Sequence, residues 1–541
     1  MAENRALTLG QQITFALGNF GVAFSPTVVA AWLGYFYYGQ ENEAGQPRVL
    51  VNAATFGVIW FLCNALNGVT DPVVGYLSDR TRSKMGRRRP WIIIGAPFLA
   101  LSFFFLWTPI TPAHSFANSA LLFVCLFFFW FFFTVVVGPY CALLPDITPY
   151  DRERVRISAF MGGFEVVGTV LGNLLPPLMT SLLVAGILFL HSGYQVMAFI
   201  AASTMVLFFT IAVLSTKERF ADKVTDAIPH NVFWLILAAL GIEVAISGIG
   251  YVFYALGDNL LGFASELSGN AAAMASIKVL ACAAGLVVWT YITVAIYKKI
   301  SIVKKSLLEF ASVFKNPSFP PYVVGVGFYR MAIATIVFIT PFIAVKVLGS
   351  YPLGSSETAL LKAVGAVKDN GSPDWELAAG YLMMVVMVGA AVFFPLVSIL
   401  EHKVSKRSLF ITSLSWMGVI LLLMSTIGKW PFLSPLFQAM VLFSLATFPV
   451  AIALVILRPL LADVIDADEK ITGQRREGVY NGMEGLIMKV AAGLGPMLAG
   501  FIFTAFGSTT TENLGIRICG PVAGVCLLIA AFAFTRYPIR S

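Results

Sequence analysis

Long apolar runs recur along this chain, and each is long enough to cross a membrane as a helix. The hydrocarbon core of a bilayer is about 30 Å thick and needs about 20 predominantly apolar residues per helix. The sequence is 58% hydrophobic and only 12% charged, about half the charged share of a typical soluble domain. It therefore predicts an all-α polytopic membrane protein. We expect fourteen spans, near residues 12–39, 51–77, 91–111, 117–144, 157–183, 193–215, 231–257, 274–297, 319–348, 378–400, 408–427, 431–461, 478–506 and 516–536.

Basic residues gather in alternate loops between these runs. Of the 36 Lys and Arg residues, 26 fall in one set of loops and at the two ends, and five fall in the opposite loops. Cytoplasmic loops carry the excess of Lys and Arg in membrane proteins. We therefore expect both termini in the cytoplasm and the protein in the inner or plasma membrane of a cell. The net charge of +8 then reflects topology, and no nucleic-acid partner is predicted.

Two polar stretches divide the chain near its middle. Residues 215–231 follow the sixth span and residues 298–316 follow the eighth, so they enclose an extra hairpin of two spans. Without that hairpin, six spans precede and six follow, the architecture of transporters built from two six-helix halves. The predicted parts are an N-terminal bundle (1–216), cytoplasmic linkers with the extra hairpin (217–316) and a C-terminal bundle (317–541). We expect a monomer.

A carboxylate interrupts the second apolar run. Asn64, Asn67 and Asp71 recur at spacings of three and four residues, so all three fall on one face of a helix. Charges inside hydrocarbon are costly and mark transport pathways more often than structure. Oxygen-bearing side chains also suit hard cations. The face could line a cation site, or it could be a polar seam that joins this helix to a neighbour.

Three stretches form sequence motifs. They are Asp-Pro-Val-Val-Gly-Tyr at 71–76 with the basic loop 78–91, Gly-Pro-Tyr at 138–140 with 144–154, and Leu-Ala-Asp-Val-Ile-Asp-Ala-Asp at 461–468 with 472–478 and Lys489. These stretches resemble the glycoside–pentoside–hexuronide:cation symporters, the melibiose-carrier-like branch of the major facilitator superfamily. They lie in the expected order in both halves, and some of their residues also resemble sucrose–proton symporters more weakly.

The resemblance implies a coupling site. It assigns Asp71, Thr134 and Lys489 to cation coupling, and it places Asp71 and Lys489 on neighbouring helices, where their opposite charges would pair. Asn67 stands where the family has a second acid, so the coupling ion is either a proton or Na⁺ at Asp71. The family's other sugar ligands are replaced, since Ala23 and Val137 stand at two acidic positions. Galactoside recognition of the melibiose type is therefore not predicted.

Other polar residues inside spans are further candidates. Glu165 is set among glycines, where an uncompensated carboxylate suits a proton carrier. For Glu165 and Arg330 a static buried ion pair is the structural alternative, and for the tyrosines it is core or interfacial packing. The candidates for substrate binding are Arg330, Tyr35, Tyr140 and Asn64.

Charged residues in the loops after the second, fourth and tenth spans of the twelve-helix core form a candidate cytoplasmic gate. Alternating access needs a charge network with two arrangements, whereas a purely topogenic loop is the simpler alternative. The gate candidates are Asp79, Arg80, Gly86, Arg87, Arg88, Asp146, Asp463, Asp466, Arg475 and Arg476.

These observations favour a secondary transporter over an enzyme. No set of nucleophile and base, metal-ligand spacing or phosphate-binding glycine loop occurs, and the four histidines are scattered. We predict symport of a small-molecule solute, a sugar or glycoside, with no cofactor besides the coupling ion H⁺ or Na⁺. The alternative is a transporter of lysolipid or another amphiphile, which also occurs in this branch of the superfamily.

Overall fold

A computed structural model describes residues 6–41, 46–79, 81, 83, 85–181, 192–216, 218, 312–368, 371–474 and 476–539. Within these residues the regular elements are helices, besides two isolated β-bridges. The N-terminal helices are α1 (Leu9–Ala16), α2 (Gly18–Gly34), α3 (Ala53–Asp79), α4 (Arg89–Phe105), α5 (Phe116–Ile147), α6 (Asp151–Ser181) and α7 (Gly193–Leu214). The later helices are α11 (Phe319–Phe342), α12 (Ser355–Ala363), α13 (Trp375–Glu401), α14 (Lys406–Met424), α15 (Pro435–Thr472), α16 (Glu477–Phe506) and α17 (Leu514–Phe534).

Eleven helical segments of the described chain are long and apolar enough to cross a membrane, and α4, with 17 residues, is a shorter apolar helix. The all-helical prediction is confirmed. Two of the fourteen expected spans, near 231–257 and 274–297, lie outside the described residues, so the count of fourteen and the extra hairpin stay predictions. Several expected boundaries differ from the helix ends, and the largest difference is at α15. The span predicted to end near 461 continues as helix α15 to Thr472, because the acidic residues after Leu461 are compatible with helix and Gly473 ends it with a left-handed backbone.

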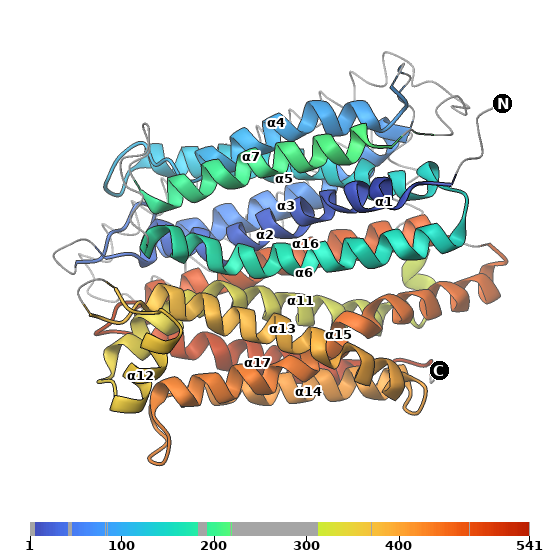
Figure 1. Cartoon of the computed structure of the whole chain (residues 1–541). Coiled ribbons are helices and arrows are strands. Elements are labelled where there is room, and N and C mark those ends of the chain that lie inside the picture. The colour runs from blue at the N-terminus through green and yellow to red at the C-terminus, as the bar shows by residue number, and fades with distance from the viewer. Residues whose placement is uncertain are drawn as a thin grey trace. The chain divides into compact units, whose positions relative to one another are not determined.

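The chain forms two compact units, and helix α3 contributes to both. The first unit comprises residues 1–37 and 69–238, and the second comprises 38–68 and 239–541. In the first unit α2 packs on α6, and α4 packs on α5 and α7 (Figure 1). Glycines let α2 and α6 approach closely, since a Cβ at Gly168 would lie 2.7 Å from the Phe20 carbonyl oxygen. The prediction that divides the chain at residues 216 and 316 stays a prediction.

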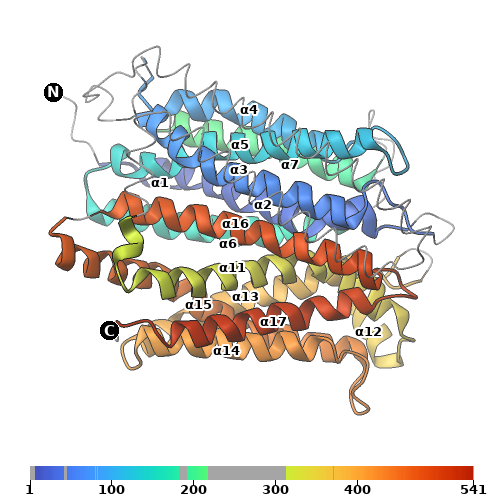
Figure 2. The ribbon, with the colours of Figure 1, turned by 180° about the vertical axis from the view of Figure 1, so that it is seen from behind.

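In the second unit α11 packs against α16 and α17, while α14 packs against α15 and α17 (Figure 2). The first part of α3 lies along α16 at a series of small residues. A Cβ at Gly57 would lie 2.7 Å from the Cα atom of Met497, and a Cβ at Gly493 would lie 3.2 Å from the Cα atom of Phe61. Small residues at such crossings let helices pack by close backbone approach, which is how helices associate in membranes.

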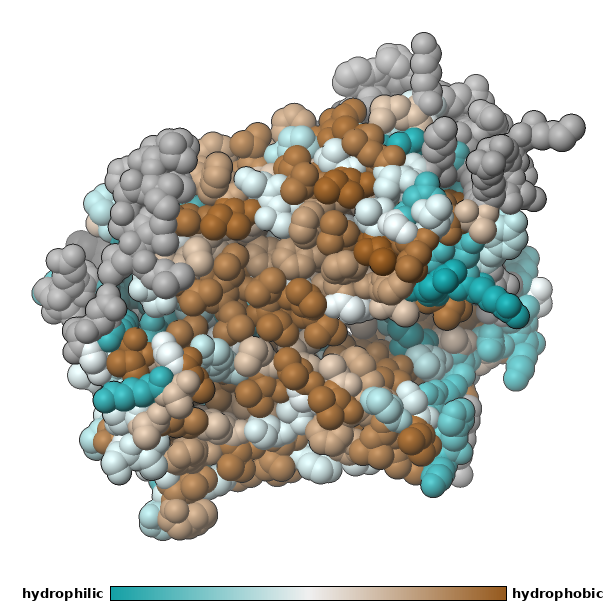
Figure 3. Space-filling model, in the orientation of Figure 1, coloured by the Kyte–Doolittle hydropathy of each residue, from teal (hydrophilic) through white to brown (hydrophobic). Residues whose placement is uncertain are grey.

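The surface along the helices is strongly apolar. Figure 3 shows hydrophobic residues over most of the visible helix surface, with hydrophilic residues gathered toward the helix ends. On α4 the exposed residues Ile94, Phe98, Leu101 and Phe105 recur at spacings of three and four, which is one face of a helix. A continuous exposed apolar face on a helix of this kind is suited to lipid rather than to water.

We expect Gly57→Ala to destabilise the protein by about 1–3 kcal/mol, the usual cost of overpacking. The added methyl group would meet the backbone of Met497, which cannot rotate away. Thermal unfolding of the purified protein in detergent measures the effect. The matched control is Gly485→Ala in α16, where nothing lies within 4 Å of an added Cβ. Equal destabilisation by both substitutions would contradict the proposed close packing of α3 on α16.

Candidate functional site

The polar site of the first unit joins α3 and α5. The Thr134 hydroxyl on α5 donates a hydrogen bond of 2.6 Å to Oδ1 of Asp71 on α3. Thr134 is buried and Asp71 is partly exposed, so the carboxylate is held by the protein but remains accessible. A carboxylate and a hydroxyl supply oxygen atoms suited to a proton or a hard cation as cargo. Among the described residues no group of three His, Cys, Asp or Glu side chains could hold a metal ion.

The two asparagines of the same helical face belong to the second unit. Both are buried. The Asn64 amide donates to the Trp60 carbonyl of its own helix at 2.9 Å, and its Cβ lies beside Gly493 of α16. These contacts fit the polar-seam interpretation of Asn64. The stripe predicted from helical periodicity is therefore divided, with its asparagines in one unit and its carboxylate in the other.

The side chain of Lys489 on α16 contacts a backbone carbonyl oxygen of helix α3. Its Nζ atom donates to the Asn67 carbonyl at 3.4 Å. In an α-helix this carbonyl also accepts the amide hydrogen of the residue four positions later, which is Asp71. The ammonium group thus binds α3 one turn before the coupling candidate. The pairing of Asp71 with Lys489 stays a prediction.

Glu165 lies near the middle of the 31-residue helix α6. Its carboxylate is exposed and accepts a hydrogen bond of 3.3 Å from the Asn19 amide of α2, which also donates to the Met161 carbonyl at 3.0 Å. Among the described residues no basic side chain lies within ion-pair distance of Glu165. The static ion pair considered for this glutamate is therefore not found within that part of the chain.

The substrate-binding candidates fall in different environments. Tyr140 is buried, stacks on Phe15 with ring centroids 5.0 Å apart, and donates its hydroxyl to the Phe15 carbonyl at 2.8 Å. Tyr35 is also buried, at the start of the π-helix Tyr35–Gly39 and edge-on to Trp32. Both tyrosines have the contacts of packing residues. Arg330 on α11 differs, because its side chain is exposed.

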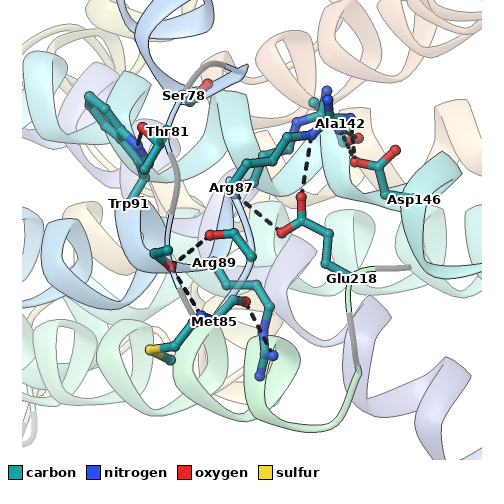
Figure 4. Close-up of polar contacts among 12 residues, drawn as sticks. Ser78, Thr81, Met85, Arg87, Arg89, Trp91, Ala142, Asp146 and Glu218 are labelled. Atoms are coloured by element: carbon teal, nitrogen blue, oxygen red, sulfur yellow. Dashed lines mark hydrogen bonds and ion pairs between the residues drawn. The ribbon is translucent and has the colours of Figure 1, made fainter. Parts of the chain in front are cut away.

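Arginines at the start of α4 form the best-defined ion-pair network of the first unit. Arg87 and Arg88 both pair with Oδ2 of Asp146 at the end of α5, at 2.8 and 2.7 Å, and Arg88 also donates to the Ala142 carbonyl. On its other side Arg87 lies 3.3 Å from the Glu218 carboxylate (Figure 4). Three of the gate candidates are thus brought together, and the network ties the loop before α4 to α5 and to the chain after α7.

Glu218 is a member of this network that the sequence reasoning missed. It follows the sixth expected span and accepts the Arg88 amide at 3.3 Å. Gly86 makes room for it, since a Cβ there would collide with the Glu218 carboxylate, and Gly86 has φ +105°. Burial raises the pKa of the Glu218 carboxyl above its usual value, although the hydrogen bond from the Arg88 amide acts to lower it. The only sequence signal was its position in the polar stretch after the sixth span.

The second unit has a separate charge network at the end of α15. Arg476 forms two hydrogen bonds to Asp468, of 2.8 and 2.6 Å, and these hydrogen bonds raise the pKa of Arg476. Lys406 pairs with Asp463 at 2.9 Å, while Asp466 is exposed. The sequence reasoning missed Asp468 as the partner of Arg476. Arg80, Arg475 and the side chain of Asp79 lie outside the described residues.

A profile of the family described as MFS/sugar transport protein matches residues 14–349 and 375–541. The chain belongs to this family. The resemblance drawn from the motifs is thereby confirmed, and the protein is a multi-pass membrane transporter of the major facilitator superfamily. An uncharacterized symporter of Synechocystis is 25% identical over 516 residues, which cover 92% of this chain and 85% of that protein.

Two further relatives match over shorter stretches. A sodium-dependent lysophosphatidylcholine symporter of Danio rerio is 34% identical over 172 residues, which are 32% of this chain and 30% of that protein. A protein named as a glycoside/cation symporter, YagG of Escherichia coli K12, is 27% identical over 223 residues, 40% of this chain and 45% of that protein. Each match therefore spans less than half the length of the relative.

Solved structures of other transporters share the fold. A peptide transporter POT in complex with sulfate has a TM-score of 0.62 at 14% identity, over 98% of this chain and 95% of that chain. The nucleoside transporter NupG has a TM-score of 0.56 at 10% identity, over 98% of each chain. The family and these neighbours are membrane transporters and not enzymes.

We expect Glu218→Gln to flatten the pH dependence of stability. Because the pKa of Glu218 is raised in the folded protein, the folded state keeps a proton where the unfolded chain has lost it. Wild-type stability should then fall as the pH rises from the usual pKa to the raised one, and the variant should lose less. Thermal unfolding in detergent between about pH 4 and pH 8 measures this. Glu512→Gln, at an exposed carboxylate, is the control, and parallel curves for wild type and Glu218→Gln would contradict the assignment.

Proposed function

We propose that this protein is a cation-coupled symporter of a sugar or glycoside that works by alternating access. The observation that carries the proposal is the hydrogen bond of 2.6 Å between Thr134 and Asp71, a carboxylate held by a second helix inside a membrane span. Membership of the MFS/sugar transport family and the partial match to a glycoside/cation symporter support it. The coupling ion is H⁺ or Na⁺, and both termini face the cytoplasm in this proposal.

Asp71 binds the coupling ion. The Thr134 hydroxyl donates to the ionised carboxylate, and the same oxygen has lone pairs to offer Na⁺ or a protonated carboxyl group. Binding of a cation neutralises the charge on α3, and this lowers the cost of moving that part of the helix through an apolar environment. An ion that binds one conformation better shifts the population toward that conformation, which is how its gradient drives transport.

Lys489 and Glu165 have supporting roles in the proposal. Lys489 donates a hydrogen bond to the α3 backbone one turn before Asp71, so a change in the conformation of that turn alters this contact. Glu165 is an exposed carboxylate with an amide donor, and it is available to carry a proton. The networks of Arg87 with Asp146 and of Arg476 with Asp468 are the cytoplasmic gates, because ion pairs near helix ends can break and re-form as the conformation changes.

A lysolipid is the second candidate substrate. It is favoured by the match to the Danio rerio lysophosphatidylcholine symporter, which has a higher identity than the glycoside symporter match but covers a smaller share of this chain. Uptake into proteoliposomes of labelled sugars and labelled lysophospholipid, each with an imposed Na⁺ or pH gradient, separates the two. Gradient-independent flux of every substrate class would contradict coupled symport.

We expect Asp71→Asn to eliminate cation-driven accumulation and Thr134→Val to change the half-saturating concentration of the coupling ion about tenfold. That concentration should rise for Na⁺, which loses an oxygen ligand, and fall for H⁺, because the ionised carboxylate loses a donor. Valine keeps the shape of threonine but removes a hydrogen bond to a charged group, worth about 1.5–3 kcal/mol. Transport by proteoliposomes at varied ion concentration measures both effects. Thr504→Val is the matched control, because that hydroxyl bonds the Gly500 carbonyl of its own helix. Unchanged ion dependence in Thr134→Val would remove this residue from the site.

We expect Glu165→Gln to abolish accumulation against a gradient while downhill exchange remains measurable. Glutamine still accepts the hydrogen bond from Asn19, so the packing of α2 on α6 is kept and only the ionisable group is lost. Counterflow and gradient-driven uptake, measured on the same proteoliposomes, give the two readouts. If the variant accumulates substrate as the wild type does, Glu165 has no part in coupling.

A further inference from the structure

Helix α11 carries an arginine in its middle. Arg330 is preceded by 11 residues and followed by 12 within Phe319–Phe342, so about three helical turns separate it from either end. Most residues in the apolar part of the segment that contains this helix are buried. The backbone of Arg330 therefore lies near the middle of a helix that is long and apolar enough to cross a membrane, far from the loops.

The side chain of Arg330 is exposed, although the residues directly before and after it in the sequence are buried. Tyr329 and Met331 are 6% and 7% exposed. Gly327 and Ala334, one turn to either side on the same face, are small and partly exposed. A Cβ added at Gly327 would meet only Ile487 within 4 Å, at an ordinary contact distance of 3.7 Å. Arg330 thus reaches an accessible surface flanked by small residues.

The acids near other membrane-embedded cations of the second unit already have partners. Glu484 lies 3.9 Å from Arg458 and also accepts the Tyr322 hydroxyl, and Lys346 pairs with Glu41. Within the described residues, Arg330 has no ion pair and no hydrogen bond. Within the described residues, no protein carboxylate therefore neutralises the positive charge of Arg330.

An arginine in this position is costly without a ligand. An arginine at the centre of a membrane span is unfavourable, and such residues mark solute or ion pathways. The guanidinium group presents five donors in a planar fork, which matches the paired oxygens of a carboxylate or phosphate. Neither a hydroxyl group of a neutral sugar nor an acyl chain supplies a charge for it.

We propose that Arg330 binds an anionic group of the transported solute, a carboxylate or a phosphate. That the bound solute is also transported rests on the proposed function. The inference itself restricts the solute to molecules that carry a negative charge. An acidic sugar and a lysophospholipid both have this chemistry. Arg330 determines specificity between charged and neutral members of either class, while Asp71 binds the coupling ion.

Ligand-dependent thermal unfolding of the full purified chain tests the proposal with two matched pairs of probes. One pair is glucose and glucuronate, and the other is monooleoylglycerol and its phosphate ester, so each pair differs in an anionic group. In one of the two pairs, we expect the anionic member to bind at least about tenfold more tightly than its neutral partner, which is the effect of a charge-assisted hydrogen bond. The pair that responds identifies a sugar or a lipid as the source of the anion.

Substitutions at Arg330 assign the effect to this side chain. Arg330→Gln should remove the preference for the anion and leave the neutral probe unaffected, while Arg330→Lys should keep part of the preference because it keeps the charge but not the fork. Lys362→Gln removes the same charge from an exposed position on α12 and should change nothing. If Arg330→Gln does not fold, the comparison of wild type with Arg330→Lys still measures how much of the preference for the anion depends on the guanidinium group.

Two results would overturn the proposal: no preference for an anion in the wild type, or the same preference in Arg330→Gln. Binding is measured without an ion gradient, so it is independent of symport. Either of these results, found together with cation-driven uptake of the solute, would refute the anion site and leave symport intact. Anion binding that depends on Arg330, without any coupled uptake, would refute symport and leave the anion site intact.

Discussion

A charged or polar group inside a membrane has to be satisfied by the protein or by a ligand, because hydrocarbon offers it no hydrogen bonds. The polar contacts of the two units follow from this constraint. Asp71 receives the hydroxyl of Thr134, Glu165 receives the amide of Asn19, and Lys489 donates to a backbone carbonyl of α3. Each contact joins one helix to another, so charges that a transporter needs for its chemistry also help to fix the packing of its helices.

The ends of the helices satisfy their charges differently. Arg87 and Arg88 share Asp146, and Arg476 has two hydrogen bonds to Asp468. These are direct ion pairs close to loops, where water can replace a broken contact. Arg88, Asp146 and Asp468 are buried, so these pairs open only in a conformation that lets in water or offers new partners. This division is compatible with the alternating access and the ion site proposed above.

Prediction from the sequence worked where the relevant neighbours are close in the chain or fixed by helical periodicity. The apolar runs predicted the helices, and the motif residues Arg87, Arg88 and Asp146 do meet. It failed for Glu218 and Asp468 as partners, because their roles depend on the approach of the Glu218 side chain to Gly86 and on a helix that continues past Leu461. It also predicted one polar face for Asn64, Asn67 and Asp71, and the packing divides that face between two units.

The sequence by itself determined that the chain crosses a membrane as helices and which positions carry charge within them, because hydrophobicity and helical spacing are local properties. Only the tertiary structure decided which helix supplies each partner: α5 for Asp71, α2 for Glu165 and the chain after α7 for Arg87. It also placed Tyr140 in a buried position and Arg330 in an exposed one. These outcomes depend on which helix faces come together, and that follows from the close fit of glycines and side chains across helices far apart in sequence.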